Sequence, residues 1–153
     1  MIVVTGASGN VGRPLVEALA AAGEKVTAVS RNPLSHDLPE GARHVRADLA
    51  DPSTLGPALE GAEALFLLLA GDLLGGGAPA VEVLAAAREA GVRRVVLLSS
   101  QINATRPDAL SHGRLREYEE AVRGSGRTGR SCARAASPPT PTPGSRASAP
   151  SAR

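Results

Sequence analysis

Three glycines spaced three residues apart constrain this chain more than any other feature of its sequence. The segment Thr5-Gly6-Ala7-Ser8-Gly9-Asn10-Val11-Gly12 follows a β-branched run at residues 1–5 and precedes an apolar helical pattern that ends at Gly23. We therefore predict a strand, a turn and a helix in that order. Glycines at this spacing allow a tight turn, bring bare backbone close to a phosphate group and let the helix pack closely on the strand. In this context they are the fingerprint of a dinucleotide site, whereas glycines outside it would form a flexible surface turn.

Four further β-rich runs alternate with helical patterns along the chain. The runs cover residues 24–30, 43–47, 64–70 and 94–100, and the helical patterns cover residues 52–61, 80–90 and 114–123. The continuous apolar composition of residues 64–70 is typical of a strand buried on both faces. Together these runs predict an α/β fold with a doubly wound parallel sheet in the order 3-2-1-4-5. A nucleotide would lie over the switch point between the first and fourth strands.

The end of the second predicted strand indicates the type of dinucleotide. An acid at this place accepts the ribose 2′-hydroxyl of NAD, but the chain has Ser30, Arg31 and Asn32 here. A guanidinium with hydrogen-bonding neighbours suits the 2′-phosphate of NADP. We therefore expect NADP (NADPH) as the cofactor in preference to NAD. An Arg31 side chain that extends into solvent is the alternative.

Asp48 and Leu49 follow the third predicted strand. The carboxylate of Asp48 can accept from the adenine amino group while Leu49 packs on the ring, or Asp48 can cap the helix that begins near Pro52. The glycine-rich residues 71–79 either pass close to the nicotinamide end of a cofactor or form a flexible connector.

With Val95-Val96-Leu97-Leu98-Ser99-Ser100 of the fifth strand, these segments resemble the NmrA-like branch of the atypical short-chain dehydrogenase/reductase family. The resemblance covers residues 1–126 and implies a Rossmann fold that binds NAD(P). The branch holds NADPH-binding quinone reductases, nucleotide-sensing regulators and epimerase-like proteins. The cofactor-binding residues that it implies are Gly6, Ser8, Gly9, Asn10, Val11 and Gly12 at the pyrophosphate, Arg31 at the 2′-phosphate, and Asp48 and Leu49 at the adenine.

The catalytic side departs from the family's pattern. Other short-chain dehydrogenases pair a serine past the fifth strand with Tyr-x-x-x-Lys on the next helix, so that the lysine lowers the tyrosine pKa. Here the only tyrosine, Tyr118, has Val122 four residues on, and no lysine follows Lys25. The catalytic residues are therefore unknown. The remaining candidates are Ser99, Ser100, His112 and Arg116, the last two at the i, i+4 spacing of that dyad. A histidine that caps the following helix is the alternative for His112.

The composition of the chain changes near residue 124. All 15 acidic residues and twelve of the 17 basic residues lie in residues 1–123, which carry a net charge of −3, whereas the last 30 residues carry five arginines and no acid. The high isoelectric point therefore belongs to the tail, which lacks aromatic residues to stack on bases, and we do not expect a nucleic acid partner. We expect an NAD(P)-binding domain in residues 1–126 and a disordered Arg/Pro/Ser/Ala-rich tail in residues 127–153, with the family's substrate subdomain missing.

A truncation or a frameshift in the coding sequence explains this change in composition. If residues 126–137 are encoded by GC-rich codons, inserting one T after the fourth base of their coding sequence changes the encoded residues to GLDWTVLRPGGF. This sequence resembles the sixth strand and following turn of the family, and it has the β-rich pattern that the observed tail lacks. We expect the chain as it stands to show weak cofactor retention and no measurable turnover.

Two further features restrict the class of protein. The single cysteine, Cys132, excludes an intrachain disulfide and a thiolate metal cluster, so we expect no metal. No apolar run is long enough to span a bilayer, and Met1 leads straight into a strand, which predicts a cytoplasmic protein with no membrane partner. Two functions fit these observations. One is hydride transfer from NADPH to a small carbonyl or quinone-like acceptor, and the other is a non-catalytic NAD(P)-sensing regulatory role. The substrate is unknown.

Overall fold

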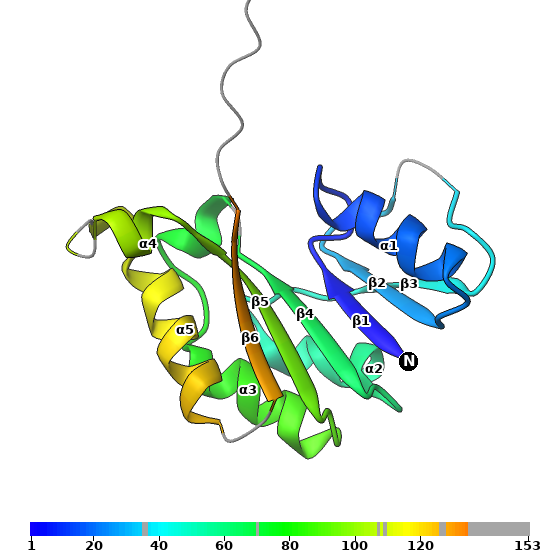
Figure 1. Cartoon of the computed structure of the whole chain (residues 1–153). Coiled ribbons are helices and arrows are strands. Elements are labelled where there is room, and N and C mark those ends of the chain that lie inside the picture. Colours follow the sequence, from blue (N-terminus) through cyan, green and yellow to red (C-terminus); the bar gives the residue numbers. More distant parts are fainter. Residues whose placement is uncertain (35–36, 70, 107, 109, 126–127, 135–153) are drawn as a thin grey trace, which may run out of the picture.

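The computed structural model of the chain describes residues 1–34, 37–69, 71–106, 108, 110–125 and 128–134. These residues form a parallel sheet of six strands in the order β3-β2-β1-β4-β5-β6 (Figure 1). The strands are β1 Ile2–Thr5, β2 Val26–Ser30, β3 Ala42–Arg46, β4 Ala64–Leu68, β5 Arg94–Ser100 and β6 Thr128–Arg134. The predicted doubly wound α/β sheet with the order 3-2-1-4-5 is confirmed, and β6 extends it by one strand.

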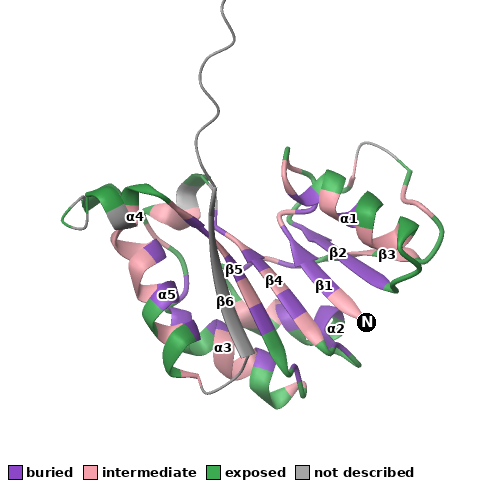
Figure 2. Cartoon of the chain, in the orientation of Figure 1, coloured by how far each residue is buried: buried purple, intermediate pink, exposed green. Residues whose placement is uncertain are grey.

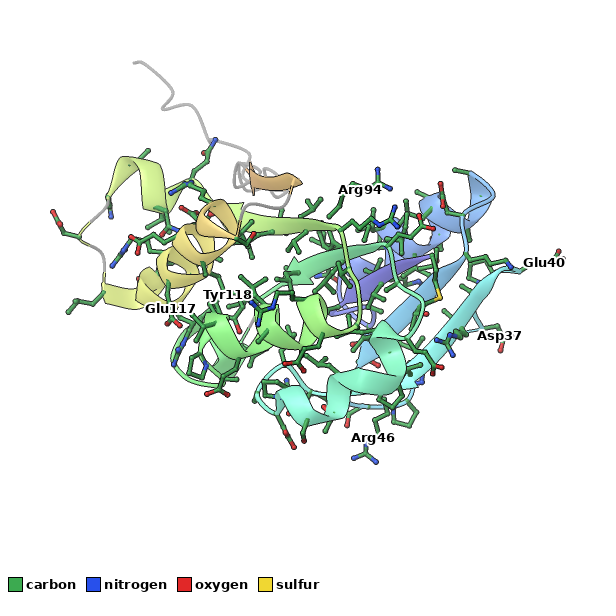
Figure 3. All side chains as sticks on the ribbon, turned by 90° about the horizontal axis from the view of Figure 1, so that it is seen from below. Asp37, Glu40, Arg46, Arg94, Glu117 and Tyr118 are labelled. Carbon is green, nitrogen blue, oxygen red and sulfur yellow. The ribbon has the colours of Figure 1, made fainter. Side chains whose placement is uncertain are left out.

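Helices cover the two faces of the sheet unequally. The α-helices are α1 Gly12–Ala21, α2 Gly56–Leu59, α3 Ala80–Glu89, α4 Ile102–Thr105 and α5 Gly113–Gly124, and the 3-10 turns are η1 Pro52–Leu55, η2 Gly71–Leu74 and η3 Leu110–His112. Figures 1 and 3 place α1 on one face, and α2, α3 and α5 on the other. Right-handed crossovers explain this arrangement, because the chain moves from β1 toward β3 in one direction and from β4 toward β6 in the other. We did not predict α4 and η3.

Each face of the sheet has its own hydrophobic core. The larger core joins the sheet to η1, α2, α3 and α5, with Leu59, Leu67 and Leu97 almost completely buried. The smaller core joins β1 and β2 to α1 through Val4, Val16, Val26 and Ala28. Complete burial of a Val or Leu side chain stabilises a fold by about 1.5–3 kcal/mol. The two cores therefore hold the strand ends, where a nucleotide would bind, in a fixed arrangement.

β4 is buried on one face only, which corrects the prediction of a strand buried on both. Leu65 and Leu67 are buried, whereas Phe66 and Leu68 are only partly buried (Figure 2). The reason is the position of α1, which packs on β1 and β2. Phe66 lies at the margin of the core that α1 forms. An apolar run shows that a strand is apolar on both sides, but not whether a helix covers both.

The sixth strand lies in a segment that we expected to be disordered. β6 pairs with β5 over its whole length, from Arg94 opposite Thr128 to Ser100 opposite Arg134. The bonds of a parallel ladder come from backbone groups, which any residue except proline can offer. The chain leaves α5 next to the open edge of β5, so this segment can pair without β-rich side chains. The prediction of disorder is wrong for residues 128–134, and residues 135–153 lie outside the described part of the chain.

Candidate cofactor-binding site

The glycine turn joins β1 to α1 as the spacing predicts. Gly6 has a positive φ of 66°, in the region that favours glycine. The amide of Gly9 donates to the carbonyl oxygen of Gly6 at 3.0 Å and closes the turn. A Cβ atom on Gly12 would lie 2.2 Å from the carbonyl oxygen of Gly6. The third glycine is therefore required for the close approach of α1 to the turn.

Thr5 separates β1 from β4 at the switch point of the sheet. The paired residues of these two strands end at Val4 and Phe66. Beyond them the Thr5 hydroxyl donates to the carbonyl oxygen of Phe66 at 3.1 Å and accepts from the amide of Leu68 at 2.9 Å. A side chain thus occupies the place of the next ladder bonds, and the strands part at the point where a nucleotide would enter. Thr5 was not among the predicted site residues, although it stands directly before the first glycine.

A pocket of about 180 Å³ opens at the carboxyl ends of β1 to β4. Its lining residues are Thr5, Gly6, Ser8, Gly9, Val29, Ser30, Arg31, Ala47, Asp48, Leu49, Leu68 and Leu73. The structure therefore brings together six of the predicted site residues, namely Gly6, Ser8, Gly9, Arg31, Asp48 and Leu49. Asn10, Val11 and Gly12 lie further along, where α1 begins, and do not line this pocket.

The structure distinguishes the two roles considered for Asp48. Asp51, not Asp48, is the N-cap of η1, and its carboxylate accepts from the amide and the hydroxyl of Ser53. The carboxylate of Asp48 accepts from the amide of Ala50 at 2.9 Å within the same turn. Asp48 lies beside Leu49 on the pocket wall, so the capping alternative does not apply to it.

The glycine-rich residues 71–79 fold back onto the same pocket. Leu73 of η2 lines it together with Asp48 and Leu49. A Cβ atom on Gly77 would lie 2.8 Å from Leu73 and 3.7 Å from Ala50, which shows how closely this loop approaches the turn after β3. The loop therefore lies next to the residues expected at the adenine. Its approach to the nicotinamide end, the first of the two alternatives considered, stays a prediction.

None of the four catalytic candidates lines this pocket. The hydroxyl of Ser99 donates to Glu119 of α5 and is buried on the face that carries α3 and α5. Ser100 accepts from the amide of Ile102 at 3.3 Å. His112 occupies the N-cap position of α5 without a side-chain capping bond, and its Nδ1 lies 2.8 Å from the hydroxyl of Ser111. Arg116 lies one turn into α5, and its guanidinium is close to Gly113.

Tyr118 contributes to packing and not to the pocket. It is 2% exposed, and its hydroxyl donates to the carbonyl oxygen of Ala78 at 3.2 Å. Its neighbour Glu117 accepts from the amide of Ala80 at 2.8 Å, so the two residues of α5 hold the start of α3 (Figure 3). Burial raises the pKa of Tyr118 to about 12, although the charge of Arg114 opposes this rise. Tyr118 is therefore a poor proton donor.

Glu119 is a buried carboxylate that was not among the predicted site residues. It is 8% exposed, and it accepts from Ser99, from Asn103 Nδ2 at 2.9 Å and from Arg123 Nη2 at 3.1 Å. Burial acts to raise the pKa of Glu119, but the hydrogen bonds from Ser99 and Asn103 and the charge of Arg123 outweigh it, so the pKa is lowered. The ionised carboxylate thus joins β5, α4 and α5.

We expect Glu119→Gln to destabilise the protein at pH 7 by about 1–3 kcal/mol, since it removes a charged acceptor from three donors. Because the pKa of Glu119 is lower in the folded state than in the unfolded state, its ionisation stabilises the folded protein at a pH above the unfolded-state pKa. This stabilisation is lost as the pH falls through the folded-state pKa. The difference between the variant and the parent should therefore shrink below about pH 4.3. Urea unfolding between pH 3 and pH 7 measures this, with the exposed Glu120→Gln as control. Equal stability of both variants at pH 7 would contradict it.

The sequence matches the family model of NAD(P)H-binding proteins over residues 6–125. This chain belongs to the NAD(P)H-binding family. The match includes the glycine turn, Arg31, and Asp48 with Leu49, and it ends just after α5. The NAD(P) binding that the resemblance implied is thereby confirmed. None of the curated protein sequences matches the chain.

Solved structures of NAD(P)-binding proteins share the fold of this family member. A Rossmann-fold NAD(P)-binding family protein from Shigella flexneri has a TM-score of 0.70 at 21% identity, over 85% of this chain and 64% of that chain. An NADPH-dependent quinone oxidoreductase from Escherichia coli, complexed with NADPH, has a TM-score of 0.65 at 29% identity, over 83% and 46% of the two chains. A short-chain dehydrogenase/reductase superfamily protein from Agrobacterium tumefaciens with bound NAD has a TM-score of 0.63 at 28% identity, over 86% and 47%. The chain thus spans less than two thirds of each of these proteins.

Among the described residues, no three His, Cys, Asp or Glu side chains are placed to hold a metal ion. No helix among the described residues is both long and apolar enough to cross a membrane.

Proposed function

We propose that this chain binds NADP(H) as the cofactor-binding part of an NmrA-like oxidoreductase. The observation that carries the proposal is the position of Arg31, which lines the pocket at the end of β2 together with the glycine turn. The turn from Ser30 to Pro33 contains no acid that could accept the ribose 2′-hydroxyl of NAD. A guanidinium at this place favours a 2′-phosphate.

The other site residues have roles that follow from their positions. Gly6, Ser8 and Gly9 line the pocket where the pyrophosphate would lie, and Asn10, Val11 and Gly12 continue into the N-terminus of α1, where amide groups and the helix dipole attract an anion. Asp48 and Leu49 would contact the adenine. Leu73 adds an apolar side chain to the part of the pocket that Asp48 and Leu49 line.

The reaction that we propose is hydride transfer to a small carbonyl or quinone-like acceptor. NADPH would supply the hydride, and the residues of this chain would hold the cofactor and orient it. The likeness to the quinone oxidoreductase from Escherichia coli, at 29% identity, supports this class of acceptor. We further propose that the protein acts in the cytoplasm on a small molecule, with neither a nucleic acid nor a membrane as partner.

A non-catalytic NAD(P)-sensing role is the second candidate. The sensing role is favoured because two hydroxyl groups that could donate a proton to a substrate already donate within the protein. Tyr118 donates to Ala78, and Ser99 donates to Glu119. NADPH oxidation against a panel of quinones distinguishes the two functions. Turnover supports the reductase, and tight NADPH binding without turnover supports the sensor.

Arg31→Ala tests the choice of cofactor. The parent should bind NADPH more tightly than NADH, and the variant should lose about 1.5–3 kcal/mol of NADPH binding, the strength of a charge-assisted contact, with NADH affinity unchanged. Calorimetric titration with both dinucleotides measures this. Arg94→Ala, at the opposite end of the sheet, is the control for net charge. Equal affinities of the parent for NADPH and NADH would refute the proposal.

A further inference from the structure

The turn after β2 is held at two of its carbonyl groups. Arg46 is the last residue of β3, and its Nε donates to the carbonyl oxygen of Arg31 at 3.0 Å. The hydroxyl of Ser30 donates to the carbonyl oxygen of Asn32 at 2.6 Å and lies 2.8 Å from His44 Nε2. Since the hydroxyl's one proton goes to Asn32, His44 Nε2 is the donor in the second contact. Ser30 also pairs with Arg46 in the ladder between β2 and β3, so both strands fix the turn that carries Arg31.

Two basic residues thus lie next to each other, Arg31 on the pocket wall and Arg46 bonded to the Arg31 carbonyl oxygen. Arg31 and Arg46 are both exposed. Neither takes part in an ion pair among the described residues, in contrast to Arg13, Arg114 and Arg123. Figure 3 shows Arg46 at the outer edge of the protein, well apart from the carboxylates of Asp37 and Glu40. Like charges at one place repel each other, and a bound dianion relieves that repulsion.

We infer that Arg46 is the second cation of the 2′-phosphate site. Its Nε is used for the bond to Arg31, and its two terminal Nη groups have no hydrogen-bond partner among the described residues. A guanidinium presents such groups in a geometry that suits phosphate oxygens. Arg31 from β2 and Arg46 from β3 therefore act on the same phosphate, and Ser30 and His44 are positioning residues for the turn. The inference rests on the proposed function, because this phosphate is what distinguishes NADP from NAD.

Four proteins test the inference: the parent, Arg46→Gln, Arg46→Lys and Arg94→Gln. The affinities to measure are those for NADPH, NADH, adenosine 2′,5′-bisphosphate and AMP. Arg46→Gln should weaken binding of NADPH and of the bisphosphate by about tenfold or more, with NADH and AMP unchanged. Arg46→Lys retains a cation and should recover part of the loss. Arg94→Gln makes the same charge change at the far end of β5 and should bind all four ligands like the parent.

The outcomes separate this inference from the proposed function. If the parent prefers NADPH to NADH and Arg46→Gln keeps this preference in full, Arg46 does not contact the phosphate. The inference is then refuted, whereas the proposed function stands. If Arg46→Gln loses affinity for NADH and NADPH equally, its role is structural and the inference is again overturned. If the parent binds NADH as tightly as NADPH, the proposed cofactor choice and this inference fall together. Circular dichroism of each variant confirms that the comparison is made between folded proteins.

Discussion

Gly12→Ala is expected to weaken NADPH binding severely. The new Cβ atom would lie 2.2 Å from the carbonyl oxygen and 2.7 Å from the carbonyl carbon of Gly6, and 2.9 Å from the Cα of Ala7. These are backbone atoms, which cannot rotate away as a flexible side chain would. Either α1 must move off the turn or the turn must open. Both changes separate the amide groups that would surround the pyrophosphate, so we expect at least about a hundredfold loss of affinity, or roughly 3 kcal/mol.

The same substitution should cost stability, by about 1–3 kcal/mol for an overpacked contact. Gly56→Ala is the matched control, because Gly56 lies at the start of α2 with no atom within 4 Å of its added Cβ. That variant should bind NADPH like the parent. NADPH titration and thermal melting of the three proteins measure the two effects. If Gly12→Ala retains the parent's affinity, the glycine turn is not the pyrophosphate site.

Exchange of residues 126–137 for GLDWTVLRPGGF is expected to stabilise the protein strongly. The exchanged segment contains β6, whose sequence TGRSCAR has few of the residues that favour strands. Its partner β5 has a fully buried face with Val95 and Leu97, and a partly buried one with Val96 and Leu98. A strand with Trp, Val and Leu can bury more apolar area against these faces, and each such side chain contributes about 1.5–3 kcal/mol when buried. We therefore expect the melting temperature to rise by about 10 °C or more.

A chain in which the same twelve replacement residues are scrambled is the control for this exchange, since it has their composition without their strand pattern. The restored chain should also remain in solution at higher concentration and retain NADPH better, because less apolar surface stays open at the edge of the sheet. Sequencing of the gene around residue 127 tests the frameshift itself. The frameshift hypothesis fails if the reading frame is confirmed and the 153-residue protein is stable and reduces a quinone with NADPH.

Much of the cofactor side could be predicted because its signals are local. The glycine turn lies between a strand and a helix that each have their own periodicity, so its place at the switch point follows from the order of elements. The positions of Arg31 and of Asp48 with Leu49 follow from the ends of strands β2 and β3. The structure places all three of these residues on one pocket, as expected from a parallel sheet in which strand ends share an edge. Their contacts with the cofactor remain predictions.

The sequence by itself determined the alternation of strands and helices, and hence the order of the first five strands, because hydrophobic periodicity and glycine positions act over a few neighbouring residues. Only the tertiary structure decided which polar side chains meet. Thr5 bonds to Phe66 and Leu68, Ser99 to Glu119, and Arg46 to the backbone of Arg31, and each pair lies on different elements. The structure also decided that β6 pairs with β5, since an open strand edge offers hydrogen bonds to any backbone that lies beside it. No local pattern encodes such contacts, because they depend on how far apart the packed helices and strands place their residues.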